Sequence, residues 1–297
     1  MTLRILTYNI EWGFLTLPDD VEYDACGHKL PHSKEAQEEH LTLAAKNIGL
    51  SVPNVCFLEE MGSLDAVNFI RDKIVEIYGI RYNTVYSRDT ETGQQGIGIL
   101  IAGYIKYDLI NLPDFGYKRA FGIKIKSNFT SRNKKTNSKF IYDIHIIGVH
   151  SKSLYGEDKM RNIAIQEHEA DVINKYFENT INKKNNPAVI FCGDFNNTVD
   201  SPPIQKIVKF RANNNERLLD LMDSEYFITN ITQSKETQFS KNYSTRIDYI
   251  WCNESFAMSC CKSIQIIELQ RLNYSGKELD LRLENSDHLP VLGIFDV

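Results

Sequence analysis

The chain has 297 residues, 42% of them hydrophobic, so it can bury the core of one large α/β or all-β domain or of two smaller domains. The formal net charge of −5 and the pI near 5.9 argue against the broad positive field by which many nucleic-acid-binding proteins attract phosphates. A bound metal ion would add positive charge that this count leaves out, so a nucleic-acid substrate stays open.

The first residues, MTLRILTYNIEWGF, contain one arginine, a short apolar run and no small-residue cleavage site. Nowhere does an apolar run reach the length that spans a bilayer. The six cysteines show no disulfide spacing, which favours reduced thiols. We therefore expect a soluble, cytoplasmic protein without a signal peptide, and we expect it to be a monomer.

Runs of β-branched and aromatic residues predict nine strands. In chain order they lie at 3–8, 55–58, 81–86, 97–102, 120–125, 140–149, 188–192, 246–251 and 291–295. Helical periodicity predicts four helices, around 41–48, 67–77, 165–177 and 204–208. The strands do not alternate strictly with the helices, which disfavours a parallel barrel or a doubly wound sheet. Because no repeat or Pro/Gly-rich linker divides the chain, we predict a single domain over residues 1–297.

Two polar segments interrupt these elements. Residues 126–139 form a basic insertion, which we interpret as a solvated hairpin loop and not as a finger that contacts phosphate. Residues 19–40 contain one cysteine and three histidines, but their spacing matches no zinc module. We expect this second segment to be a mobile surface loop.

Polar residues gather where the predicted strands end, a position from which rigid scaffolds commonly present catalytic groups. Each group alone has a structural explanation, since Asn and Asp cap turns and a lone His is usually structural. Together they supply the carboxylates, amides and imidazoles that metal-assisted phosphate chemistry requires. The segments are 8–12, 57–61, 148–153, 191–197, 245–249 and 286–290.

The order of these segments resembles the endonuclease/exonuclease/phosphatase superfamily, from Tyr8 to Pro290. The most specific pieces are GDFN at 193–196, RIDY at 246–249 and SDH at 286–288, with GQQGIGILI from Gly93 as a lesser one. The resemblance implies an α/β fold of the α+β type, a four-layer α/β/β/α sandwich in which two mixed sheets pack face to face with helices outside. It also implies a Mg²⁺-dependent phosphoesterase that uses water directly, without a covalent intermediate.

The resemblance assigns a metal site and a base. Glu60 is the principal Mg²⁺ ligand, with Asn9 and Asp287 beside it, and Mn²⁺ is an acceptable substitute. A hard ion of this kind prefers carboxylate oxygens and keeps several waters, which leaves positions for a substrate phosphate. His288 activates the attacking water and is oriented by Asp248, because a carboxylate fixes the imidazole tautomer and stabilises its protonated form.

The remaining assignments concern the phosphate. Asn196 donates to a phosphate oxygen, while Asp194, two residues earlier on the same side of an extended segment, orients the nucleophile or protonates the leaving group. His150 lies where the nuclease, sphingomyelinase and deadenylase branches carry histidine, whereas abasic-site endonucleases carry tyrosine. Lys152 and Arg161 are candidates for holding substrate phosphates, although surface exposure is the ordinary role of such residues.

We therefore predict hydrolysis of phosphodiester bonds in a nucleic acid or nucleotide, a preference that rests on His150 and on the VHSKS segment at 149–153. The alternative is a phosphomonoesterase or phosphodiesterase that acts on inositol phosphates or lipid headgroups. A catalytically inactive scaffold would have lost at least one central residue, and all are present in the sequence.

Overall fold

The structure is a computed structural model that describes residues 2–16, 33–88, 95–115, 119–132, 139–154, 158–183, 187–223, 236–239, 244–267, 286 and 288–297. The helices in these ranges are α1 (Lys34–Ser51), α2 (Leu64–Tyr78), α3 (Lys159–Ile181), α4 (Pro202–Lys209) and α5 (Glu254–Cys260). The strands are β1 (Thr2–Gly13), β2 (Val55–Met61), β3 (Tyr82–Arg88), β4 (Gly96–Ala102), β5 (Tyr107–Asn111), β6 (Ala120–Arg132), β7 (Lys139–His150), β8 (Ala188–Asp194), β9 (Leu218–Asp220), β10 (Gln238–Phe239), β11 (Ser244–Thr245), β12 (Asp248–Asn253), β13 (Cys261–Ile266) and β14 (Val291–Asp296).

Two six-stranded mixed sheets form the centre of the fold. The first has the order β13-β14-β1-β2-β4-β3 and the second β5-β6-β7-β8-β12-β9, while β10 and β11 form a separate two-stranded ribbon. In each large sheet one central pair is parallel, β1 with β2 and β7 with β8, and the other pairs are antiparallel. Mixed pairing is what a chain that alternates hairpins with helical crossovers produces.

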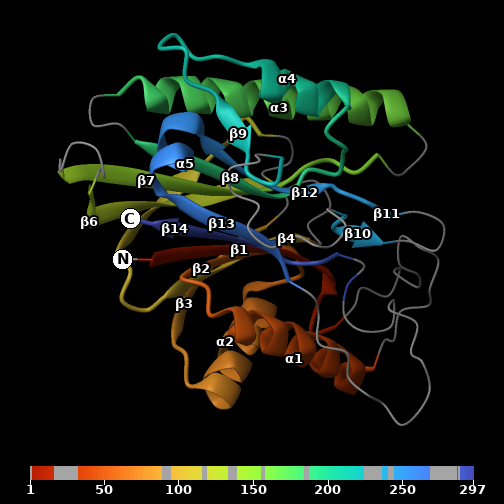
Figure 1. The fold of residues 1–297 in the computed structure, drawn as a ribbon. Coiled ribbons are helices and arrows are strands. Elements are labelled where there is room, and N and C mark those ends of the chain that lie inside the picture. The colour runs from red at the N-terminus through yellow and green to blue at the C-terminus, as the bar shows by residue number, and fades with distance from the viewer. Residues whose placement is uncertain are drawn as a thin grey trace.

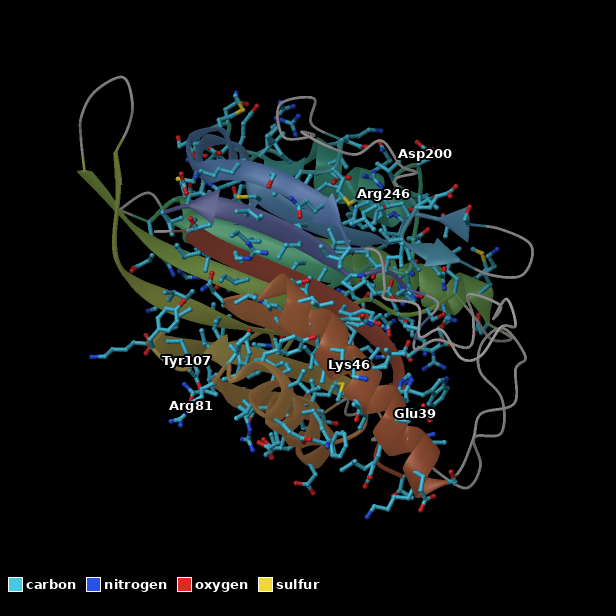
Figure 2. All side chains as sticks on the ribbon, turned by 60° about the horizontal axis from the view of Figure 1, so that its bottom comes forward. Glu39, Lys46, Arg81, Tyr107, Asp200 and Arg246 are labelled. Carbon is cyan, nitrogen blue, oxygen red and sulfur yellow. The ribbon has the colours of Figure 1, made fainter. Side chains whose placement is uncertain are left out.

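Helices cover the outer face of each sheet. In Figure 1, α1 and α2 lie below the first sheet, whereas α3 and α4 lie above the second sheet. The amphipathic character of α1 explains this placement: Leu41, Ala44 and Ile48 are buried, while the charged Glu39 and Lys46 project from the same helix in Figure 2. Figure 2 also shows Asp200 and Arg246 on the far side of the sheets from α1. The expected α/β/β/α sandwich is therefore confirmed.

The core between the sheets is closely packed. One buried cluster contains Phe57 of β2 and Ile146 of β7, so side chains from both sheets share it. Gly148 on β7 has a specific reason to be glycine, because a Cβ there would clash with the ring of Phe57. A second cluster, which includes Phe177 and Phe191, joins the second sheet to α3.

All nine predicted strands and all four predicted helices are present, with boundaries that differ by a few residues. Two predictions about loops need correction. The loop expected at 126–139 is shorter than predicted, because the pairing of β6 with β7 continues to Arg132 and Lys139. The expected loop over 19–40 is helical from Lys34 on, because Ser33 caps α1 through the N–H of Ala36. Residues 19–32 of that segment lie outside the described residues. Within the described ranges no helix has the length and apolarity to cross a bilayer.

Candidate active site

The ends of five strands from both sheets bring the predicted residues together. In the second sheet, His150 pairs with Asp194 between β7 and β8, and Asp194 pairs with Asp248 between β8 and β12. Gly193 allows β8 to pair this closely with β7. Its φ is 140°, and a Cβ at this position would clash with the carbonyl of Val149. Three functional side chains thus stand side by side on neighbouring strands.

An imidazole and a carboxylate form the best-defined pair in the site. The Nδ1–H of His288 donates to Oδ2 of Asp248 at 2.8 Å, and both side chains are almost fully buried. This hydrogen bond leaves Nε2 as the acceptor nitrogen, 3.9 Å from Oδ2 of Asp194. The Oγ of Ser286 fixes the loop, since it accepts from the N–H of His288 and donates to the carbonyl of Asn9.

Glu60 occupies the first sheet's side of the site. Its φ of 61° and the register shift between β2 and β4 turn its carboxylate away from the regular strand. Oε1 accepts from the amide of Asn9 at 3.1 Å, and Oε2 accepts from the amide of Gln95 at 2.9 Å. The neighbouring Glu59 points to the other face, is fully buried, and accepts from Thr7. Burial raises the pKa of Glu59 well above its usual range.

Asn9 links the two halves of the site. Its amide nitrogen donates to Glu60 on the first sheet and, at 3.1 Å, to Oδ2 of Asp194 on the second. Asp194 also accepts from the backbone and side-chain N–H groups of Asn196, at 2.7 and 3.1 Å. Burial raises the pKa of Asp194 to about 7, with His288 acting in the opposite direction.

His150 lies between the two carboxylates, with Nε2 3.7 Å from Glu60 and 3.9 Å from Asp194. Burial lowers the pKa of His150 well below its usual range, and the positive charge of Arg119 acts in the same direction. The imidazole of His150 is therefore a neutral hydrogen-bonding group near pH 7 in this arrangement.

A cavity of about 450 Å³ opens over these groups. It is lined by six of the predicted residues, Glu60, His150, Lys152, Asp194, Asn196 and His288, while Asn9 and Asp248 are buried behind it. Arg161 is exposed on α3 and is not among the described residues that line the cavity. The prediction for Asp287 lies outside the described residues.

The donor set fits a hard divalent cation. No group of three or more His, Cys, Asp or Glu side chains in the described ranges is arranged to hold a metal ion. Mg²⁺, however, is usually bound by one or two carboxylates and keeps several waters. Glu60 meets that requirement, because its side chain is 19% exposed at the cavity and its polar neighbours orient it. The amide nitrogen of Asn9 faces Glu60 and Asp194, while its Oδ1 accepts from the N–H of Glu11, so Asn9 would have to rotate its amide to place an oxygen beside Glu60.

Two residues of α3 support the site from behind. Gln166 donates to the carbonyl of Lys152 at 2.6 Å and accepts from the amide of Asn197 at 2.7 Å, so it ties the loop after β7 to the loop after β8. Glu169 accepts from the N–H of Lys152 at 3.2 Å, and burial raises its pKa to about 8. The sequence resemblance includes Gln166, on the helix after the VHSKS segment, without giving it a role. It singles out neither Glu169 nor Gln95, although Gln95 lies inside the GQQG segment.

The cavity at the edge of the two-sheet sandwich carries the acid, amide and imidazole groups that a phosphoric ester hydrolase requires. The sequence profile described as "Endonuclease/Exonuclease/phosphatase family" matches residues 6–265. The chain therefore belongs to the endonuclease/exonuclease/phosphatase family, whose members depend on a divalent metal ion.

Solved structures with the same fold include an endonuclease/exonuclease/phosphatase from Bacteroides vulgatus, with a TM-score of 0.62, 14% identity and coverage of 100% of this chain and 99% of that one. D. rerio TDP2 complexed with single strand DNA product gives 0.60, 14%, 100% and 99%. The human Nocturnin catalytic domain with bound sulfate anion gives 0.58, 15%, 99% and 94%. At these identities the likeness concerns the fold. A search of curated protein sequences finds no match.

Proposed function

We propose that the protein is a Mg²⁺-dependent phosphodiesterase that hydrolyses a phosphodiester bond of a nucleic acid or nucleotide by direct attack of water. The observation that carries the proposal is the His288–Asp248 pair, 2.8 Å apart, at the wall of the cavity that Glu60 and Asn196 also line. Hydrolytic phosphoryl transfer requires a base, a metal ligand and a hydrogen-bond donor to the phosphate, and all three lie at one cavity.

His288 is the general base in this proposal. Because Nδ1–H is held by Asp248, Nε2 is the atom that takes the proton of the attacking water. The buried carboxylate of Asp248 then stabilises the imidazolium that forms. Asp194, 3.9 Å from Nε2, lies where it either orients the water or protonates the leaving oxygen.

Glu60 is the principal metal ligand in this proposal, with Asn9 and Asp287 as the further candidates. A bound ion supplies Lewis-acid stabilisation of the negative charge on the phosphate. Mg²⁺ is the proposed ion and Mn²⁺ a functional substitute, since both accept carboxylate oxygens in an octahedral shell. Asn196, His150 and Lys152 then provide hydrogen-bond donors and positive charge for the phosphate oxygens.

The nucleic-acid preference draws support from the neighbour solved with a single-stranded DNA product. The acidic net charge does not oppose an inositol phosphate or lipid headgroup, so these substrates belong in the same test. Purified protein is incubated with single- and double-stranded DNA, RNA, nucleotides and inositol phosphates, in Mg²⁺, Mn²⁺ or EDTA. We expect metal-dependent cleavage of oligonucleotides or nucleotides.

The matched variants are His288→Ala and His168→Ala. His168 is an exposed histidine on α3 whose ring bonds the carbonyl of Asp114, outside the cavity lining. We expect a loss of roughly 10²- to 10⁴-fold in kcat for His288→Ala and no loss for His168→Ala. Equal activity of the two variants would remove His288 from the mechanism, and release of phosphate from inositol phosphates alone would favour the alternative substrate class.

Three further expectations stay predictions: that residues 1–297 form one catalytic domain, that the protein is a monomer, and that it is cytoplasmic. Limited proteolysis, light scattering and cell fractionation respectively would test them.

A further inference from the structure

The end of β1 has an unusual backbone at the edge of the cavity. Glu11 and Trp12 have φ values of 51° and 59°, in the left-handed region that side chains other than glycine rarely adopt. The pairing of β1 with β2 shifts register between Asn9 and Gly13, so Glu11 and Trp12 lie in a β-bulge. Such bulges next to active sites commonly redirect a side chain.

Asn9 and Glu60, which are proposed to bind the metal, hold this bulge in place. The N–H of Glu11 donates to Oδ1 of Asn9 at 2.9 Å, and the N–H of Trp12 donates to Oε2 of Glu60 at 3.4 Å. The ring of His40, on α1, hydrogen-bonds to the backbone of the same segment. The position of the Trp12 side chain is thus coupled to the carboxylate that is proposed to bind the metal.

The bulge places Trp12 in the lining of the cavity. Trp12 lines the cavity together with Glu60, Arg119 and Lys152, and it is only partly buried. The buried ring of Phe14 contacts the Trp12 side chain: the two ring centroids are 6.0 Å apart, and Phe14 is 6% exposed. A partly exposed aromatic side chain in the lining of a cavity that holds the proposed phosphate-binding groups can receive a flat ring.

We infer that Trp12 is a stacking platform for one nucleobase adjacent to the scissile phosphate. This inference rests on the proposed function and deepens it, because it selects substrates that carry a base over inositol phosphates and lipid headgroups. Stacking on an aromatic side chain tolerates every base, since each has a π face. The platform would therefore give a preference for nucleic acid without a preference for sequence.

The two tryptophans of the chain allow a direct test. Trp251 is 1% exposed, so Phe is a conservative replacement that removes its fluorescence. Trp12 is then the remaining source of tryptophan fluorescence in the protein. The reporter protein carries Trp251→Phe with His288→Ala, which prevents turnover. The probes are a short single-stranded oligothymidylate and an oligomer of equal length in which abasic tetrahydrofuran units replace every nucleoside, both in Mg²⁺ at one salt concentration.

We expect the oligothymidylate to quench the fluorescence of Trp12 in a saturable way and to bind roughly 5- to 150-fold more tightly than the abasic oligomer. In the His288→Ala background, fluorescence anisotropy of labelled oligomers should show that Trp12→Leu abolishes this difference and that Trp12→Phe keeps most of it. If the Leu variant or the Trp251→Phe background fails to fold, anisotropy of the two oligomers on the His288→Ala protein still tests the inference, because equal affinities would contradict it.

Equal affinity for the two oligomers, or an unchanged difference in Trp12→Leu, would overturn the stacking inference. Hydrolysis by the wild-type enzyme separates the two proposals. Cleavage of both oligomers at equal rates overturns the stacking inference and leaves the nuclease function intact, whereas cleavage of neither overturns the proposed function and the inference with it.

Discussion

Replacing Asp248 with Asn tests the proposed base most directly. Asp248 is 2% exposed, and its Oδ2 accepts the Nδ1–H of His288 at 2.8 Å. The substitution preserves the size of the side chain. The backbone of Asp248 stays paired with Asp194 in β12 and β8 and keeps its hydrogen bond to Oγ1 of Thr237. The change therefore removes the negative charge beside the imidazole and little else.

The magnitude follows from the nature of that hydrogen bond. A hydrogen bond to a charged group contributes about 1.5 to 3 kcal/mol, and each 1.36 kcal/mol in the barrier changes the rate tenfold, so we expect kcat to fall roughly 10- to 150-fold. Asp248 is not among the described residues that line the cavity, so the KM of Asp248→Asn should stay close to that of the wild type.

The assay is steady-state hydrolysis of the best oligonucleotide or nucleotide substrate in saturating Mg²⁺. Asp171→Asn is the matched control, because Asp171 is an exposed carboxylate on α3 that pairs with Lys206 at 2.7 Å, outside the cavity lining. A kcat for Asp248→Asn within about threefold of wild type, or a tenfold rise in KM at unchanged kcat, would contradict the role given to this pair.

Gln166→Leu removes the clamp between the loops after β7 and β8, so we expect kcat to fall roughly tenfold while the circular dichroism stays native. Glu60→Gln should weaken Mn²⁺ binding in calorimetry by about tenfold or more, whereas His288→Ala should leave that affinity unchanged. Gly193→Ala should lower the free energy of unfolding by about 3 kcal/mol or more in urea denaturation, because its Cβ would clash with Val149 at a φ of 140°. His145→Gln should reduce the loss of stability on acidification, measured by urea denaturation at several pH values.

The sign of the His145 effect follows from its pKa. Burial lowers that pKa to about 4 in the fold, against about 6.5 in an unfolded chain. The unfolded state therefore binds more protons, and His145 makes the protein less stable as the pH falls from about 6.5 to 4. The full effect is roughly 3 kcal/mol, and Gln, which does not titrate, should be spared it. Parallel pH profiles of wild type and variant would contradict this prediction.

Three other results would count against the reasoning. Native kcat in Gln166→Leu would show that the two loops are held elsewhere. Unchanged Mn²⁺ affinity in Glu60→Gln would move the metal site away from Glu60. Wild-type stability in Gly193→Ala would mean that β7 and β8 can separate at this point without cost.

The sequence predicted the interior of the fold better than its edges. The buried strands are continuous apolar runs, such as 97–102, and such runs are visible without any structure. The edge strands β5 and β13 were not predicted because they carry charged and polar residues on their exposed positions. The short helix α5 was also missed, since seven residues give too little periodicity to recognise.

The site shows the same division. Glu60, Asp194 and His288 were identifiable because their motifs lie at strand ends and recur in a known order. Gln166 and Glu169 act through contacts that exist only once α3 packs beside β7 and β8, and no local pattern encodes such contacts. The bulge at Trp12 could not be predicted either, because no glycine marks the left-handed backbone there and the Trp12 N–H donates to Glu60 of another strand.

The close fit of Gly148 against Phe57 sets how far apart the two sheets can stand, and two parts of the site belong to opposite sheets: Glu60, the proposed metal ligand, lies on β2, and Asp248, which orients the proposed base, lies on β12. The rate of turnover should therefore depend on the distance between the two sheets. A substitution that widens the core by a fraction of an ångström can leave the protein folded and still abolish its catalytic activity. Catalysis should consequently fade on warming before the cooperative melting transition begins.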